Sequence, residues 1–247
     1  MPETTSEIAL LAQESGWRAA TYRNLSALFA DAPSVDALEA LIGAAEAIDA
    51  EDVRSASEAG FYAYLRTLRK RGDAGLRRAV ASEYAELFVG PRPPLAPLYE
   101  SVYLGSPSRL FTEQTMSVRR FYERCGLAVV KDGKVPDDHI AYELELMSEL
   151  AQRAAQALEA GRIEGALDLA RTQREFLVVH LGGWAGLFAS RIAEAPCADF
   201  YAALSCFVQG FVREDDAYLG QAISSLESLR VSIESPVETG ANVTVQL

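Results

Sequence analysis

The stretch EYAELFVGPRPPLAPLYESVYLG, from Glu83 to Gly105, divides the chain, because an apolar helical pattern there runs directly into a proline-dense loop. Five of the ten prolines fall within the seventeen residues from Pro91 to Pro107. Each proline fixes φ, removes a backbone donor and pushes the preceding residue toward extended geometry, so a helix cannot continue through this segment. We therefore expect a long, pre-shaped loop between two helices.

Long loops without structure of their own are uncommon in compact domains, and they are usually functional or disordered. This loop carries Tyr99, Val102, Tyr103 and Leu104, residue types in which disordered linkers are poor. The pattern favours a binding loop. The alternative is a rigid connector whose tyrosines only fill the core.

On both sides of the loop, apolar residues recur at spacings of three and four, and no alternating run is long enough for a strand. The sequence predicts an all-α fold: a single globular helical domain over residues 1–230, with about ten helices and a loosely ordered tail at 231–247. In the first helix Leu10, Trp17, Leu25 and Leu28 are expected to face inward. The expected helices cover about 6–29, 35–50, 52 or 55 to 71, 74–88, 108–125, 136–160, 163–179, 183–193, 198–213 and 216–229. Ser34 can cap the second helix, Asp52 or Ser55 can open the third, and Ser108 can cap the fifth, with Gly126 at its C-terminal side.

The composition, 49% hydrophobic residues in a chain of 247, is typical of a soluble globular protein with one sizeable core. A net charge of −12 argues against nucleic acid as a partner, since nucleic-acid binding needs clustered cations. It would favour a basic peptide, although such a charge can also serve solubility alone.

Residues Met1–Ser15 show no cationic start followed by an apolar run, so we expect no secretory signal and a cytoplasmic protein. Cys125, Cys197 and Cys206 form no CxxC pair, which suits reduced thiols. The most apolar run, Phe176–Ala189, is too short and too polar to span a bilayer, so no stable membrane insertion is expected.

A second informative segment is PDDHIAYELELM, from Pro136 to Met147. Pro136 is tolerated in a first helical turn, and Asp137 and Asp138 favour the positive end of a helix dipole, so a helix is expected to begin here. His139 and Glu143 lie four residues apart on one face. The segment can serve recognition of a cationic or amide-bearing ligand, or helix capping alone.

A metal site, a hydrolytic active site and a nucleotide site have weaker support in the sequence. A metal site at His139 and Glu143 needs three or four ligands, and His180 is the only other histidine of the chain. A hydrolase triad of Ser101, Glu100 and His139 lacks the strand–turn–helix elbow, and no phosphate-binding loop predicts a nucleotide cofactor. His180, four residues before Trp184, favours a satisfied core histidine over a ligand.

Three blocks in order resemble the TorD/DmsD/NarJ family of cytoplasmic chaperones, which mature molybdenum-containing oxidoreductases. They are EYAELF with PLYESVYL, PDDHIAYELELM, and FLVVHLGGWAGLF with FYAALSCFVQGFV. The resemblance covers roughly residues 17–213. Some members have a tryptophan just before the Ser-Val-Tyr core, where this chain has Tyr99-Glu100, so the subgroup stays open.

The resemblance implies an all-helical domain with no catalysis and no cofactor of its own, acting as a monomer or a homodimer. It implies as partner the catalytic subunit of a molybdopterin oxidoreductase, whose twin-arginine or leader peptide is bound until the cofactor is inserted. By motif match, the peptide-binding residues would be Tyr99, Glu100, Ser101, Tyr103, Asp137, Asp138, His139 and Glu143.

The chemistry of these residues fits a leader with arginines before an apolar stretch, because carboxylates beside aromatic groups can read both parts. Two alternatives remain open. One is a small helical enzyme or metal-binding protein that uses His139 with nearby carboxylates. The other is a plain helical interaction module in which the loop only packs.

Overall fold

The computed structural model describes residues 2–49, 51–70, 73–105, 113–130 and 135–234. Over these residues the chain forms α-helices and no β-strand, which confirms the predicted all-α class. The helices are α1 (Pro2–Ala30), α2 (Val35–Ala47), α3 (Ala56–Arg69), α4 (Asp73–Tyr84), α5 (Glu100–Leu104), α6 (Glu113–Arg124), α7 (Ile140–Glu159), α8 (Ile163–Val179), α9 (Leu181–Ala193) and α10 (Phe200–Glu234).

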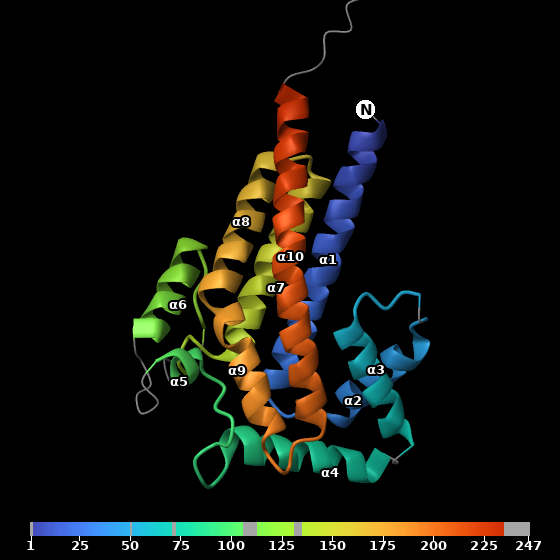
Figure 1. Ribbon diagram of the computed structural model, residues 1–247, viewed down its shortest axis with the longest axis vertical. Helices are drawn as coiled ribbons and strands as arrows, with labels where there is room; N and C mark the ends of the chain where they lie inside the picture. The colour runs from blue at the N-terminus through green and yellow to red at the C-terminus, as the bar shows by residue number, and fades with distance from the viewer. Residues whose placement is uncertain (1, 50, 71–72, 106–112, 131–134, 235–247) are drawn as a thin grey trace, which may run out of the picture.

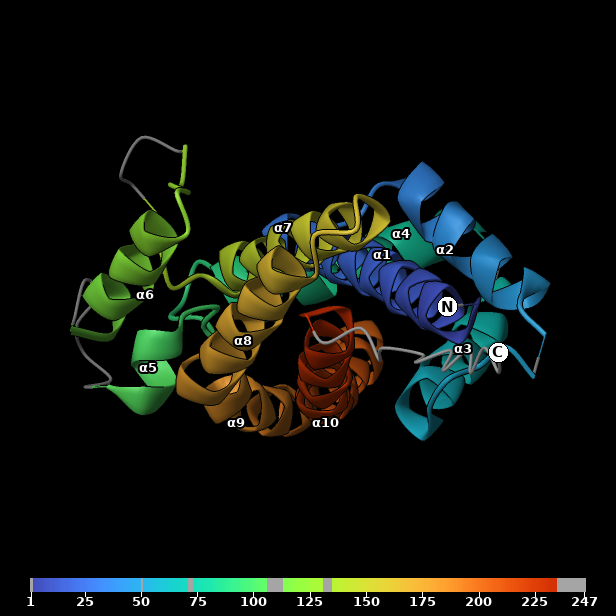
Figure 2. The same cartoon turned by 90° about the horizontal axis from the view of Figure 1, so that it is seen from above.

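Helices α1, α7, α8 and α10 run lengthwise beside one another, and α9 continues below α8 after a bend (Figure 1). Seen from above, α5 and α6 lie on one flank of this bundle, and α2 and α3 lie on the other (Figure 2). One hydrophobic core joins these parts. Its largest fully buried side chains include Trp184, Tyr22, Tyr201, Phe29 and Phe176.

Local sequence signals explain where several helices begin. The Ser34 hydroxyl accepts a hydrogen bond from the N–H of Ala37 at the start of α2, as predicted. Ser55 does the same for Glu58 in α3, so Ser55 and not Asp52 opens that helix. A serine in this position satisfies one of the backbone donors that a helix leaves unpaired at its N-terminus.

The proline loop begins where α4 widens into a π-helical turn, Ala85–Val89. Gly90 follows with φ +54, and a β-carbon there would lie 2.3 Å from the carbonyl oxygen of Arg92, so only glycine fits. The N–H of Ala96 returns to the carbonyl of Leu87 at 2.9 Å, which closes the loop on the end of the π turn.

Two predictions about the helices were wrong, and a third falls on residues outside the described ranges. The helix expected from Pro136 begins at Ile140, because the residues before it are held by a neighbouring segment described below. The helix expected from residue 108 is described from Glu113, and its proposed cap Ser108 lies outside the described residues. The short helix α5 lies within the segment expected to be loop.

The two C-terminal helices expected at 198–213 and 216–229 are one continuous helix, α10. Asp215, where a break was expected, accepts hydrogen bonds from Arg18 and Tyr22 of α1 and stays helical. Gly210 lets α10 approach α3, since a β-carbon there would lie 2.4 Å from Ser57. The helix extends to Glu234, into the predicted tail; residues 235–247 lie outside the described residues.

Leu10 was expected to face the core but is 59% exposed, whereas Leu25 and Leu28 are buried as expected. The buried face of α1 instead follows Ala12 and Tyr22. Within the described part of the chain, no single helix has the length and hydropathy to cross a bilayer; α8 and α9, bent by 44°, reach that threshold only as a pair.

Candidate functional site

The segment after the prolines and the segment before α7 lie side by side, joined by an isolated antiparallel bridge between Tyr99 and His139. The N–H of Glu100 donates to the carbonyl of Asp138 at 3.0 Å, and the N–H of Ile140 donates back across the bridge at 2.9 Å. The two motifs singled out in the sequence, about forty residues apart, therefore meet in space.

Asp138 holds the start of α5. Its Oδ2 accepts a hydrogen bond from the backbone N–H of Ser101 at 2.8 Å, so it caps a neighbouring helix and not the helix that follows it. Both residues are fully buried. The other carboxylate oxygen of Asp138 and the hydroxyl of Ser101 have no hydrogen-bond partner among the described residues.

Asp137 is directed toward α6. Its carboxylate forms an ion pair with Arg119, whose side chain is 41% exposed, and its carbonyl accepts a hydrogen bond from the Tyr122 hydroxyl at 3.0 Å. Asp137 therefore lies at the edge of the site and attaches α6 to it.

His139 is the N-cap of α7, and its Nδ1 accepts a hydrogen bond from the N–H of Ala141 at 3.2 Å. Because Nδ1 is the acceptor, the proton of the neutral ring is on Nε2. The ring lies 5.3 Å from the ring of Tyr99, edge to face, and 5.3 Å from that of Tyr142. Three aromatic rings thus form a continuous edge beside the bridge.

Tyr103, Trp184 and Glu143 form the inner wall. The ring of Tyr103 stacks on Trp184 with centroids 5.3 Å apart, and Trp184 Nε1 donates to Oε2 of Glu143 at 3.0 Å. The Tyr103 hydroxyl is buried without a hydrogen-bond partner. Burial raises the pKa of this hydroxyl, so it stays protonated.

Glu100 faces the bend between α8 and α9. Its carboxylate lies 3.0 Å from Nδ1 of His180, the residue that ends α8 and precedes α9. The other ring nitrogen of His180 lies 3.5 Å from the Ser117 hydroxyl of α6. His180 is buried and satisfied, as predicted, but its partner is a residue of the candidate site.

Glu143 is also hydrogen-bonded to Glu100, an arrangement of two carboxyl groups that requires a proton between them. Burial raises the pKa of Glu143 well above its usual range, and the nearby Glu100 and Asp138 raise it further. Glu143 therefore carries the proton. The Glu100 carboxyl thus lies between the Glu143 carboxyl on one side and Nδ1 of His180 on the other.

Four buried side-chain atoms lack a hydrogen-bond partner within the described parts of the chain, and all four belong to residues predicted for the site. They are Ser101 Oγ, Tyr103 Oη, Asp138 Oδ1 and Glu143 Oε1. Once protonated, Glu143 Oε1 can donate to Glu100, so three of the four atoms remain without a partner. Buried polar atoms without partners are costly and uncommon in folded proteins, so their concentration around α5 makes this place the candidate site.

The expectation that the carboxylates of Glu100, Asp138 and Glu143 meet a cation directly does not fit this arrangement, since each is at most 1% exposed. They point inward because α5, α7 and α9 pack together there. Tyr99 and Tyr103 are partly exposed, and Asp137 and His139 lie just below the surface. The role of all eight residues in peptide binding remains a prediction.

The triad of Ser101, Glu100 and His139 is not assembled, because Glu100 pairs with His180 and His139 binds the backbone. No group of three His, Cys, Asp or Glu side chains in the described ranges is arranged to hold a metal ion.

Sequence reasoning missed Trp184 and Arg119 as parts of this site and treated His180 as a core residue. The spacing of His180 and Trp184 was visible, yet both lie far in sequence from their partners Glu100 and Glu143. A single sequence carries no signal that pairs residues 41 and 80 positions apart.

Comparison with known proteins points to one family. The family model described as "Nitrate reductase delta subunit" matches residues 50–190, more than half of the chain. The chaperone protein TorD of Photobacterium profundum is 30% identical over 155 residues, which cover 63% of this chain and 69% of that protein.

The chaperone protein TorD of Vibrio cholerae is 27% identical over 159 residues, or 64% of this chain and 70% of the relative. The probable Tat proofreading chaperone DmsD of Haemophilus influenzae is 27% identical over 133 residues, which cover 54% and 58% of the two chains. The matched region includes the proline loop, the Asp-His segment and the bend at His180. The chain therefore belongs to the nitrate reductase delta subunit family, the TorD/DmsD/NarJ family that its motifs resemble.

Proposed function

We propose that this protein is a cytoplasmic chaperone that binds the N-terminal twin-arginine or leader peptide, and the apo-form, of a molybdopterin oxidoreductase. It holds this client until the cofactor is inserted and the enzyme is assembled or exported. In this proposal it has no catalytic activity and no cofactor of its own. Family membership supports the proposal, as do the names of its relatives, which include a Tat proofreading chaperone.

The proposal that the protein binds a peptide rests on the buried polar atoms beneath α5 that have no hydrogen-bond partner among the described residues. Two hydroxyls, of Ser101 and Tyr103, and one oxygen of Asp138 are buried there without partners. A peptide supplies backbone N–H and C=O groups, and an arginine supplies five N–H donors. In our proposal α5, a helix of five residues, moves aside, and the peptide provides these missing partners.

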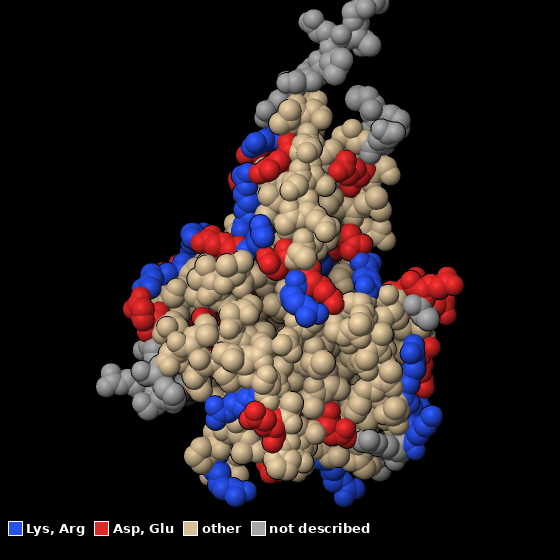
Figure 3. All heavy atoms as spheres, in the orientation of Figure 1, with Lys and Arg blue, Asp and Glu red and all other residues tan. Residues whose placement is uncertain are grey.

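The surface beside the site suits an apolar client. Val178, Val179 and Leu187, at the α8–α9 bend, are each more than half exposed. In Figure 3 the surface at the level of α9 is mostly uncharged, whereas charged side chains lie above and below it. Exposed apolar patches mark interaction sites on soluble proteins, and a client without its cofactor is expected to expose apolar segments.

The test is a pull-down of the tagged protein from its native cytoplasm, analysed by mass spectrometry. Wild type is compared with the Tyr99→Ala, His139→Ala double variant and with Leu10→Ala, an exposed position in the N-terminal half of α1. We expect enrichment of a molybdopterin oxidoreductase subunit by wild type and Leu10→Ala, and its loss in the double variant. Failure of the wild-type protein to enrich any such subunit would contradict the proposal.

A further inference from the structure

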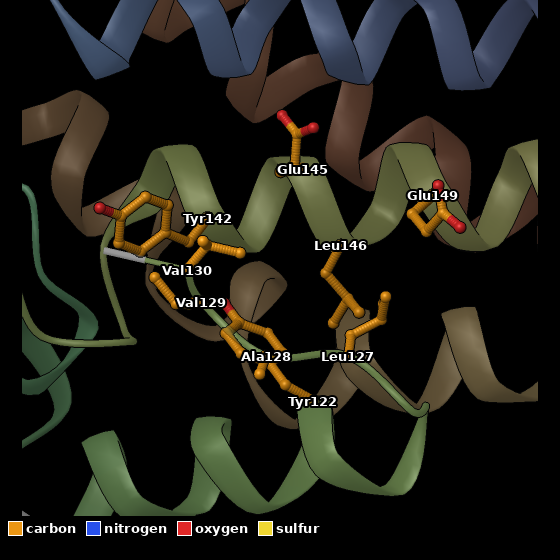
Figure 4. A pocket seen from close by; sticks show the side chains of 9 residues that line it. All are labelled: Tyr122, Leu127, Ala128, Val129, Val130, Tyr142, Glu145, Leu146 and Glu149. Carbon is orange, nitrogen blue, oxygen red and sulfur yellow. The ribbon is translucent and has the colours of Figure 1, made fainter. Parts of the chain in front are cut away.

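A hollow of about 300 Å³ lies beside the candidate site, between α7 and the residues that follow α6. Figure 4 shows it from close by: Leu146 points down from α7 toward Leu127, while Val129 and Val130 lie close to Tyr142. Pockets from about this size upward hold ligand groups in other proteins. The hollow is formed by side chains that the proposed function has not used.

One face of α7 forms the floor of the hollow. Tyr142, Glu145, Leu146 and Glu149 lie at spacings of three, four and seven residues, so they share one side of the helix. This stripe mixes apolar and acidic groups. A purely structural contact would favour an apolar stripe, since exposed carboxylates gain nothing from packing.

The opposite wall is the extended segment after α6. Gly126, with φ +69, turns the chain there, and the N–H of Leu127 donates to the carbonyl of Tyr122 at 2.9 Å. At the lip of this wall the Val130 side chain is 96% exposed. An occupant of the hollow would remove this side chain and its neighbours from water, which is favourable for apolar surface.

The two carboxylates differ in their partners. Glu149 forms an ion pair with Arg153, which neutralises its charge. Glu145 lies 3.1 Å from the uncharged hydroxyl of Ser26, which also donates to the carbonyl of Ala141 at 2.8 Å. Among the described residues, the hollow therefore combines an apolar space with one carboxylate, that of Glu145, that no basic side chain pairs with.

The hollow is continuous with the candidate site. The Tyr142 ring lines it and also lies 5.3 Å from the His139 ring, which contacts Tyr99 in turn. A peptide that binds beside Tyr99 and His139 can therefore continue along α7 into the hollow.

We propose that this hollow is a second subsite for the same leader peptide, and that it takes a large apolar side chain located two residues from an arginine. Alternate side chains of an extended peptide point to one side and lie roughly 7 Å apart, so the arginine reaches Glu145 when the apolar group enters. The inference rests on the proposed function and adds a sequence requirement to it.

The test is fluorescence anisotropy with labelled synthetic peptides that contain two arginines followed by an apolar run beginning with phenylalanine, or with alanine in its place. Wild type should prefer the phenylalanine peptide by about tenfold, a usual gain for burying such a side chain. Ala128→Phe fills the hollow from an exposed position. In this variant the preference should fall below about threefold, whereas Val231→Phe, an exposed site on α10, should leave it unchanged.

The proposed contact between Glu145 and an arginine of the peptide is tested with Glu145→Gln, and Glu149→Gln is the matched control. Glu145→Gln should weaken binding of the phenylalanine peptide more at low salt than at high salt, and Glu149→Gln should change it less. An unchanged phenylalanine preference in a folded Ala128→Phe variant would overturn the subsite alone. Binding of neither peptide by wild type would overturn the proposed function together with it. Val130→Ser, which reduces the apolar lip without adding volume, replaces Ala128→Phe if that variant fails to fold.

Discussion

The carboxylate of Glu100 lies 3.0 Å from Nδ1 of His180 and so ties α5 to the bend between α8 and α9. The two residues are 80 positions apart and almost completely buried. Since the Glu143 carboxyl also bonds to Glu100, one carboxylate connects three helices around the site. The site therefore depends on a single buried acceptor, which makes its energetics testable.

Replacing Glu100 with alanine should destabilise the protein by about 2–4 kcal/mol, because both His180 and Glu143 lose a buried partner. Urea unfolding measures the loss. Glu113→Ala is the matched control: its side chain is 79% exposed, and its cost should stay within about 0.5 kcal/mol. Equal stabilities for the two variants would show that the Glu100 contacts contribute nothing.

Glu143 should make stability depend on pH. Its pKa is raised in the folded protein from an ordinary value of 4.5, so folding keeps a proton that the unfolded chain releases. The stability that this retained proton contributes to the folded state is fully present below about pH 4.5. It is lost as pH rises toward the raised pKa, by at most about 1.4 kcal/mol per pH unit.

Glu143→Gln tests this sign, because glutamine keeps an acceptor for Trp184 and a donor for Glu100. The variant should equal wild type near pH 5 and exceed it in stability by a margin that grows toward pH 8, as measured by urea unfolding at a series of pH values between about these limits. A difference that stays constant with pH would contradict a neutral Glu143.

Tyr103→Phe should affect the stability of the protein and its affinity for a peptide in opposite ways. The Tyr103 hydroxyl is buried without a partner, so removing it should leave stability unchanged or raise it by up to about 1 kcal/mol. If a leader peptide supplies the missing partner, the same change should weaken peptide binding by about 1 kcal/mol. Thermal unfolding and peptide anisotropy give the two values. Unchanged affinity would indicate that the hydroxyl is not part of the peptide site.

Two adjacent aspartates of α10 should differ sharply in how much their replacement destabilises the protein. Asp215 is buried, pairs with Arg18 and accepts a hydrogen bond from Tyr22 at 2.6 Å, so Asp215→Ala should cost about 3–5 kcal/mol by leaving a buried guanidinium unpaired. Asp216 pairs with Arg174 at the surface, where both side chains are over 40% exposed, and Asp216→Ala should cost about 0–1 kcal/mol. Chemical denaturation of the two variants gives the comparison.

The Glu83 carboxylate should stabilise the start of α10. Its carboxylate accepts hydrogen bonds from the N–H groups of Asp199, Phe200 and Tyr201, at 2.7–3.0 Å, and so satisfies donors that the helix end leaves unpaired. Glu83→Ala should cost about 1–3 kcal/mol by urea unfolding. Glu86→Ala, one turn further along the same segment and exposed, should be close to neutral.

The sequence alone determined the elements whose causes are local. Apolar residues at helical spacing were enough for the all-α class, and a serine hydroxyl a few residues from free N–H groups was enough for the cap at Ser34. For the third helix the same reasoning left Asp52 and Ser55 as alternatives, of which the structure has Ser55. The proline-dense loop after Glu83 and the turn at Gly126 also follow from backbone chemistry within a few residues. The family resemblance came from such local blocks taken in order.

The tertiary structure decided what depends on groups far apart in the chain. Asp138 caps α5 and not its own helix, because the Tyr99–His139 bridge places the N–H of Ser101 beside it. Helix α10 continues through Asp215 because Arg18 and Tyr22 bind this carboxylate from α1. Glu100 and Glu143 turned inward because His180 and Trp184 lie beside them in the fold. Hydrogen bonds of this kind depend on distance in space, which one sequence does not specify, whereas helix periodicity and capping depend on neighbours along the chain.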